Sequence, residues 1–140
     1  MIISHLKQTY MYFCMSYDKN NNIIIKNILS PEEFYYFDRM DNYDKIHSFN
    51  LYLKVRKNIL LQDNIDYLKL ALLHDSGKIS TNFWERTKEV ILGKSQISNH
   101  PEMAYENLKD INISLAKLCK IHHNKTNIIE MIEFQKLDSL

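Results

Sequence analysis

The chain has few residues that break or bend a backbone: two glycines and two prolines in 140 residues. A β fold of many short strands needs such residues at its turns, so their scarcity favours helices. The length suits one domain with a single sizeable core, and 45% hydrophobic with 25% charged residues is typical of a globular protein. We therefore predict an all-α, single-domain bundle of about seven helices.

Cysteine is equally scarce. Cys14 and Cys119 lie far apart, which is typical of buried free thiols in a reducing compartment and not of a disulfide framework. No apolar run approaches the length of a membrane span, and polar residues interrupt the first eight positions where a signal peptide would need an apolar core. Basic and acidic residues are mixed and nearly balance at a net charge of +1, so no nucleic-acid surface is indicated. We expect a cytoplasmic protein without a membrane partner, and the oligomeric state stays open.

Helix signals occur along the whole chain. The clearest start is Ser30-Pro31-Glu32-Glu33, with Ser as N-cap, Pro at the first helical position and Glu at the third. A second predicted helix start, with Asn as N-cap, Pro in the first turn and Glu at the third position, is Asn99-His100-Pro101-Glu102. The β-branched run Ile23-Ile24-Ile25 fits a strand or a helix. Apolar spacing predicts the remaining helices over residues 1–17, about 43–58, 65–73, 81–92, 113–123 and 128–138.

The helix that begins at Ile65 leads into a polar doublet, His74-Asp75. Gly77 follows, and it suits a helix C′ position because glycine accepts positive φ. A carboxylate at the negative end of the helix dipole is disfavoured by about 0.3–1 kcal/mol unless a nearby cation neutralises its charge. Lys78 or a metal ion could be that cation. His and Asp offer ligand atoms that suit divalent transition metals, although such a pair is common without any metal.

Five of the six histidines fall at helix ends or at the edges of core-facing stripes, and only His5, in the N-terminal part, does not. Each alone reads as a core or capping histidine. Five such positions, together with Asp75, are harder to explain in that way. The adjacent pair His122-His123 is the most telling, because an imidazole on an apolar stripe is costly to bury without a ligand or a hydrogen-bond partner. The five residues are His47, His74, His100, His122 and His123.

Taken together, these motifs resemble the HD-domain superfamily of metal-dependent phosphohydrolases. The stretch Leu72 to Ile79 is similar to the subgroup with a His-Asp-Ile-Gly-Lys signature, with Ser76 in place of Ile. The stretch from Leu29 to His47 looks like small stand-alone bacterial HD proteins. The resemblance covers about residues 29–140 as an HD domain and leaves residues 1–28 as an N-terminal helical extension. The motifs that carry it occur in the family's order: His47, His74-Asp75, His100-Pro101-Glu102, His122-His123 and Asp138.

The resemblance implies a centre with two divalent transition-metal ions, of Fe, Mn, Ni, Co or Zn. One ion would be held by His47, His74, Asp75 and Asp138. Asp75 would bridge to a second ion held by His100 and His122. His123 would either bind this ion directly or contact one of its ligands. A hydroxide shared by the ions would attack phosphorus, and Asp75 and Lys78 would act as catalytic residues. An equally good interpretation of Lys78 is a cation that only stabilises the C-terminal end of the helix.

The substrate implied is a small phosphorylated compound, a nucleotide or related phosphate ester. The sequence also departs from the patterns of particular subgroups, which argues against their activities. Asn124 to Asn127 stand where the cyclic-di-GMP phosphodiesterases called HD-GYP carry Gly-Tyr-Pro, and no Glu-Asp pair follows the His-Asp helix as in alarmone hydrolases. Tyr43 stands where a carboxylate would hold a third metal. The alternative is a catalytically weak or inactive HD-type module that acts as a sensor or partner surface.

Overall fold

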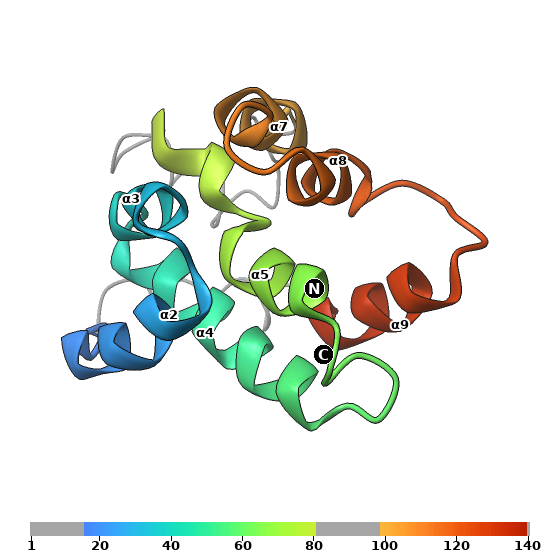
Figure 1. The fold of residues 1–140 in the computed structure, drawn as a ribbon, viewed down its shortest axis with the longest axis horizontal. Helices are drawn as coiled ribbons and strands as arrows, with labels where there is room; N and C mark the ends of the chain where they lie inside the picture. Colours follow the sequence, from blue (N-terminus) through green and yellow to red (C-terminus); the bar gives the residue numbers. More distant parts are fainter. Residues whose placement is uncertain (1–15, 81–98, 140) are drawn as a thin grey trace, which may run out of the picture.

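The computed structural model describes residues 16–80 and 99–139. Every regular element in these two ranges is helical, which confirms the predicted all-α class, and the run Ile23-Ile24-Ile25 belongs to a helix (Figure 1). The helix predicted over 81–92 and nearly all of the one predicted over 1–17 lie outside the described residues. The elements in chain order are η1 (Lys19–Asn21), α2 (Asn22–Ile28), α3 (Pro31–Asp38), α4 (Asn42–Lys57), α5 (Ile65–Leu73), η2 (Ser76–Ser80), α7 (His100–Leu108), α8 (Ile113–Ile121) and α9 (Ile129–Asp138).

Helix α5 lies at the centre of the fold and contacts α2, α3, α4 and α8 (Figure 1). A helix surrounded by others must be apolar on most of its faces, and Tyr67, Leu68 and the run from Leu70 to Leu73 are all buried. Its start is fixed by Asn64, whose side chain accepts a 3.1 Å hydrogen bond from the Asp66 backbone N–H. The central position of α5 brings the doublet at its end, His74-Asp75, into the interior.

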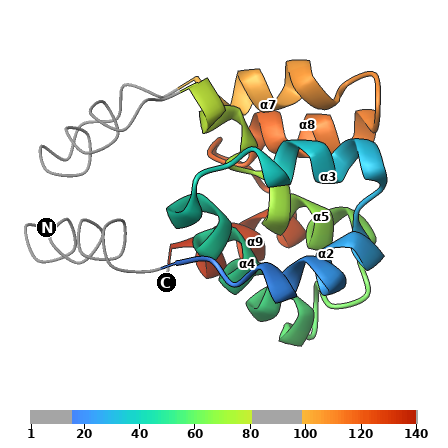
Figure 2. The ribbon, with the colours of Figure 1, turned by 90° about the vertical axis from the view of Figure 1, so that its left-hand side faces the viewer.

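Two pairs of helices lie on opposite sides of α5. Helices α7 and α8 pack against each other on one side, and α4 with α9 lie on the opposite side (Figures 1 and 2). The α-helices of the described residues share one hydrophobic core, which runs from Ile25 of α2 to Phe134 of α9. Tyr17 and Ile25 belong to the predicted extension, and both are buried in this core. The division at residues 28 and 29 stays a prediction.

Helix α3 begins as the sequence predicts, and its cap also ties three helices together. The Ser30 Oγ accepts from the Glu33 backbone N–H at 3.2 Å, and the Glu33 carboxylate accepts from the Ser30 N–H at 2.8 Å. The same buried carboxylate accepts from Lys69 Nζ of α5 at 2.9 Å and from Asn112 Nδ2, at the N-cap of α8, at 2.9 Å. Glu33 therefore fixes α8 relative to α3 and α5.

One predicted detail is wrong. Gly77 is not a C′ residue with positive φ: His74 is the C-cap of α5, and Gly77 lies inside η2 with a φ outside the left-handed region. The backbone continues into a 3₁₀ segment because residues 76–80 pack against α7, and the glycine is needed there for close approach. Asn99 is the N-cap of α7 as predicted, but its side chain makes no capping hydrogen bond.

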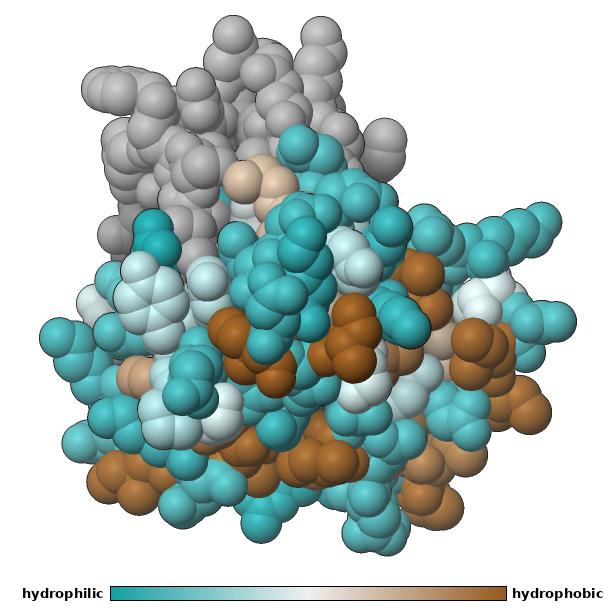
Figure 3. Space-filling model, turned by 45° about the horizontal axis from the view of Figure 1, so that its top comes forward, coloured by the Kyte–Doolittle hydropathy of each residue, from teal (hydrophilic) through white to brown (hydrophobic). Residues whose placement is uncertain are grey.

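Apolar side chains also reach the surface. On the face in Figure 3 they lie in separate groups among hydrophilic residues. Within residues 16–80 and 99–139, no helix combines the length and the apolar character needed to cross a membrane.

Candidate metal centre

The predicted site residues all come together where helix ends meet. The C-terminal ends of α5, α8 and α9 converge on the start of α7 and on one side of α4. His47 projects from α4, and His74 and His122 are the C-caps of α5 and α8. Asp75 and His123 directly follow these two C-caps, and the other three predicted residues lie in η2, at the start of α7 and at the end of α9: Lys78, His100 and Asp138.

Asp75 is at the middle of the site and is only 4% exposed. Its two oxygens face different partners. Oδ2 lies 3.3 Å from His74 Nε2 and 3.9 Å from His47 Nε2. Oδ1 lies 3.2 Å from His100 Nε2 and 3.3 Å from Lys78 Nζ. Asp75 thus belongs to two separate groups of potential ligands, one on each side of its carboxylate.

The first ligand group consists of His47, His74 and Asp75, whose ligand atoms lie within 4.8 Å of one another. Asp138 closes this group from α9: its Oδ1 is 3.0 Å from His47 Nε2 and 3.3 Å from His74 Nε2. The side chain of Asp138 is 15% exposed although it is the last residue of its helix. The group therefore joins α4, α5 and α9.

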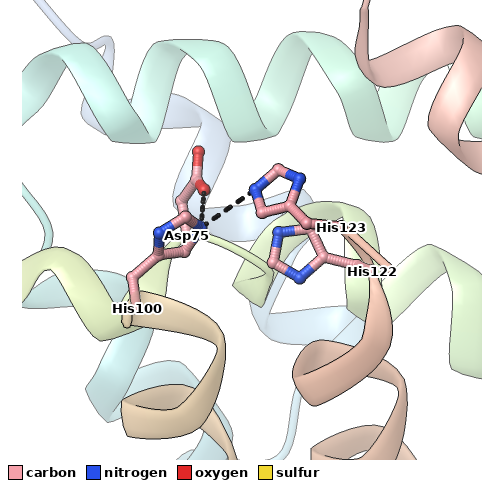
Figure 4. Close-up of side chains that lie close together, drawn as sticks. All are labelled: Asp75, His100, His122 and His123. Atoms are coloured by element: carbon pink, nitrogen blue, oxygen red, sulfur yellow. Dashed lines mark hydrogen bonds and ion pairs between the residues drawn. The ribbon is translucent and has the colours of Figure 1, made fainter. Parts of the chain in front are cut away.

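The second ligand group consists of Asp75, His100, His122 and His123 (Figure 4). His100 Nε2 lies between the Asp75 carboxylate and His123 Nε2, at 3.2 Å from each. His122 is buried at 1% exposure, as expected for an imidazole on the stripe of Leu115 and Cys119, whereas His123 is exposed. The group joins the end of α5 to α7 and α8.

Two of the buried imidazoles have a fixed orientation. His74 Nδ1 is 3.0 Å from the Ala71 carbonyl, and His122 Nδ1 is 2.6 Å from the Cys119 carbonyl. A carbonyl only accepts, so each Nδ1 carries the hydrogen and, in the neutral ring, Nε2 keeps its lone pair. Both Nε2 atoms are buried; that of His74 faces the carboxylates of Asp75 and Asp138 at 3.3 Å, and that of His122 has no hydrogen-bond partner among the described residues. A backbone carbonyl that fixes one ring nitrogen and leaves the other directed into the site is the usual arrangement of a metal-binding histidine.

The carboxylates control the protonation of His74. Burial alone would keep the ring neutral, but the charge of Asp75 and the contact with Asp138 outweigh it and raise the pKa of His74 to about 10. Burial likewise opposes charge on both carboxylates, yet His74 and Lys78 lower the pKa of Asp75, and His47 and His74 lower the pKa of Asp138. Without a metal, a proton on His74 therefore supplies the positive charge between the two carboxylates.

In the second ligand group, the pKa values of two histidines are lowered and not raised. Burial, together with the positive charge of His74 and His123, lowers the pKa of His122 to about 3. Burial and His100 lower the pKa of His123 as well. Metal ligands must be neutral imidazoles, and these two rings already are.

Two supporting residues were not predicted. Gln135 of α9 donates through Nε2 to the His122 carbonyl at 3.0 Å and to the Asn124 carbonyl at 2.8 Å, so it holds the turn that carries His122 and His123. Phe134, recognised in the sequence only as an apolar position, packs edge-on against the His74 ring at 5.8 Å between centroids. No local motif signals either contact, because each joins residues from different helices.

No family model, curated protein or solved structure matches this chain.

Proposed function

We propose that this protein is a metal-dependent phosphohydrolase of the HD-domain type, located in the cytoplasm. The observation that carries the proposal is the Asp75 carboxylate, which directs one oxygen to each of two histidine groups. The buried Nε2 of His122 adds to it, because burying such an atom is costly when none of the described residues pairs with it. In a two-metal phosphoryl-transfer centre the ions lie about 3.5–4 Å apart, and a carboxylate placed between two ligand groups would serve both.

The donor set fits such ions. The first ligand group, with Asp138, would hold one ion, and the second ligand group would hold another. Mixed nitrogen and oxygen ligands favour Fe, Mn, Ni, Co or Zn over Mg or Ca. When bound, the pair would supply Lewis acidity toward a phosphoryl group and toward water.

The protein's own contribution is to orient and to neutralise charge. The Ala71 and Cys119 carbonyls fix the rings of His74 and His122, so both can bind without rotating. Lys78, 18% exposed and 3.3 Å from Asp75, brings a cation to the rim, where it would offset charge on phosphoryl oxygens. The exposed His123 stands at the rim of the second ligand group, where it would contact a water or the substrate. We propose a nucleotide or related phosphate ester as substrate.

The test is a screen of phosphate esters with added Mn²⁺, together with elemental analysis of the purified chain. We expect hydrolysis of at least one ester and bound transition metal. His74→Ala and Asp75→Ala should abolish both while the far-UV circular dichroism stays helical. His5→Ala, a histidine outside the predicted site, is the matched control and should change neither. Bound metal without hydrolysis of any ester would favour the sensor or interaction module instead. Full metal content in His74→Ala would contradict the site itself.

A further inference from the structure

Gly77 faces the first turn of α7 at a distance that leaves no room for a side chain. A Cβ atom at this position would lie 2.0 Å from the His100 carbonyl oxygen, 2.9 Å from the His100 carbonyl carbon and 3.0 Å from the Ala104 backbone nitrogen. All three are backbone atoms, so no change of rotamer relieves the overlap. A methyl group there can be accommodated only if η2 and the start of α7 move apart.

The part of α7 that would have to move carries His100. This residue is the first of the helix, and its Nε2 is 3.2 Å from Asp75 Oδ1 and 3.2 Å from His123 Nε2. Lengthening the 2.0 Å contact to an ordinary one of at least 3.4 Å requires a shift of about 1.4 Å. Metal ligands must hold their distances to about ±0.2 Å, so such a shift would take His100 out of the second ligand group.

The first ligand group is not attached to this contact. His47 comes from α4, His74 from the end of α5 and Asp138 from α9, whereas the three atoms nearest a Cβ at Gly77 all belong to α7. Only Asp75 is shared, and it precedes η2. A displacement of α7 should therefore act on one side of the site alone.

We propose that Gly77 is a positioning residue for the second metal ion: its missing side chain lets η2 approach α7 closely enough to place His100 beside Asp75. This inference rests on the two-ion function proposed above. Gly77→Ala should weaken binding of the second ion at least about 100-fold, the upper end of the effect seen when the support of a metal ligand is lost, and leave the first unchanged.

The test is a titration of the metal-stripped chain with Mn²⁺, read by bound metal after equilibrium dialysis and by electron paramagnetic resonance, which detects the magnetic coupling of two neighbouring Mn²⁺ ions. We expect two coupled ions in the wild type and one uncoupled ion in Gly77→Ala. Ser76→Ala is the matched control. Ser76 lies in the same 3₁₀ segment and is fully buried, and within residues 16–80 and 99–139 its hydroxyl has no hydrogen-bond partner. The alanine variant adds no atoms, so it should keep two ions.

A double variant tests whether Gly77 acts through His100. If it does, Gly77→Ala combined with His100→Ala should bind the second ion no more weakly than His100→Ala alone. Two coupled ions of wild-type affinity in Gly77→Ala would overturn the inference and leave the proposed function standing. A wild-type chain that takes at most one ion would overturn the two-ion function, and the inference with it. Loss of helical circular dichroism in Gly77→Ala would also overturn it, since the residue would then support the whole fold.

Discussion

Metal binding at the first ligand group should release a proton. The perturbation is the addition of a divalent ion to the metal-free protein at pH 7. With a pKa of about 10, His74 is then protonated, and an ion can use its Nε2 only after that proton leaves. Removing it at pH 7 costs about 4 kcal/mol, because the pKa lies about three units above the pH and each unit is worth about 1.4 kcal/mol. Affinity at neutral pH should thus be about 10³-fold below that for a neutral ring.

Calorimetry measures this directly. Titrations in two buffers of different ionisation enthalpy give the number of protons released, and a pH series from 6.5 to 8.5 gives the change in affinity. We expect about one proton with the first ion and an affinity that rises about tenfold per pH unit. His122→Ala is the control: its ring, with a pKa of about 3, is already neutral, so the number released with the first ion should not change. Release of no proton at pH 7 would refute the reasoning, since His74 would then be neutral before the ion arrives.

Three further predictions follow from other contacts. Asp138→Ala should lose the first ion and keep the second, as read by metal content; loss of both would contradict the separation of the two groups. Glu33→Ala should lower the free energy of unfolding by about 3–5 kcal/mol, because Lys69 is left half-buried without its partner; urea denaturation measures this, and a loss below about 1 kcal/mol would refute it. The metal-free protein should lose stability as pH falls from about 6.5 toward 3, by up to about 1.4 kcal/mol per pH unit from His122: the unfolded ring takes up a proton near pH 6.5, while the folded ring resists until about 3. Urea denaturation at pH 6.5 and 4.5 tests the slope, and His122→Gln should flatten it.

The sequence alone predicts much of this architecture because its strongest signals are local. Caps such as Ser30 and Asn99 mark helix starts, and the apolar run before His74 marks a helix surrounded by others. Histidines at helix ends gather because several helix ends meet at one place, which is why all the predicted site residues come together. Whether they bind metal stays a prediction.

Tertiary contacts could not be predicted in this way. Glu33 was recognised as the third residue of a capping box, but its partners Lys69 and Asn112 are 36 and 79 residues away. Gly77 was given a local reason, positive φ, whereas its actual constraint is the backbone of His100. No sequence pattern predicts the role of Gln135, because the carbonyls of His122 and Asn124 come within its reach only when the chain has folded.

The first ligand group has a consequence for the lifetime of the protein. His47 and Asp138 are separated by 91 residues, so an ion held between them acts as a removable cross-link between α4 and α9. An ion that binds only the folded chain adds about 4 kcal/mol to its stability at a free concentration 1,000 times the Kd. Proteases that cleave the transiently opened chain would then find it open about 10³ times less often. Metal supply would therefore set how fast this protein is degraded as well as whether it acts.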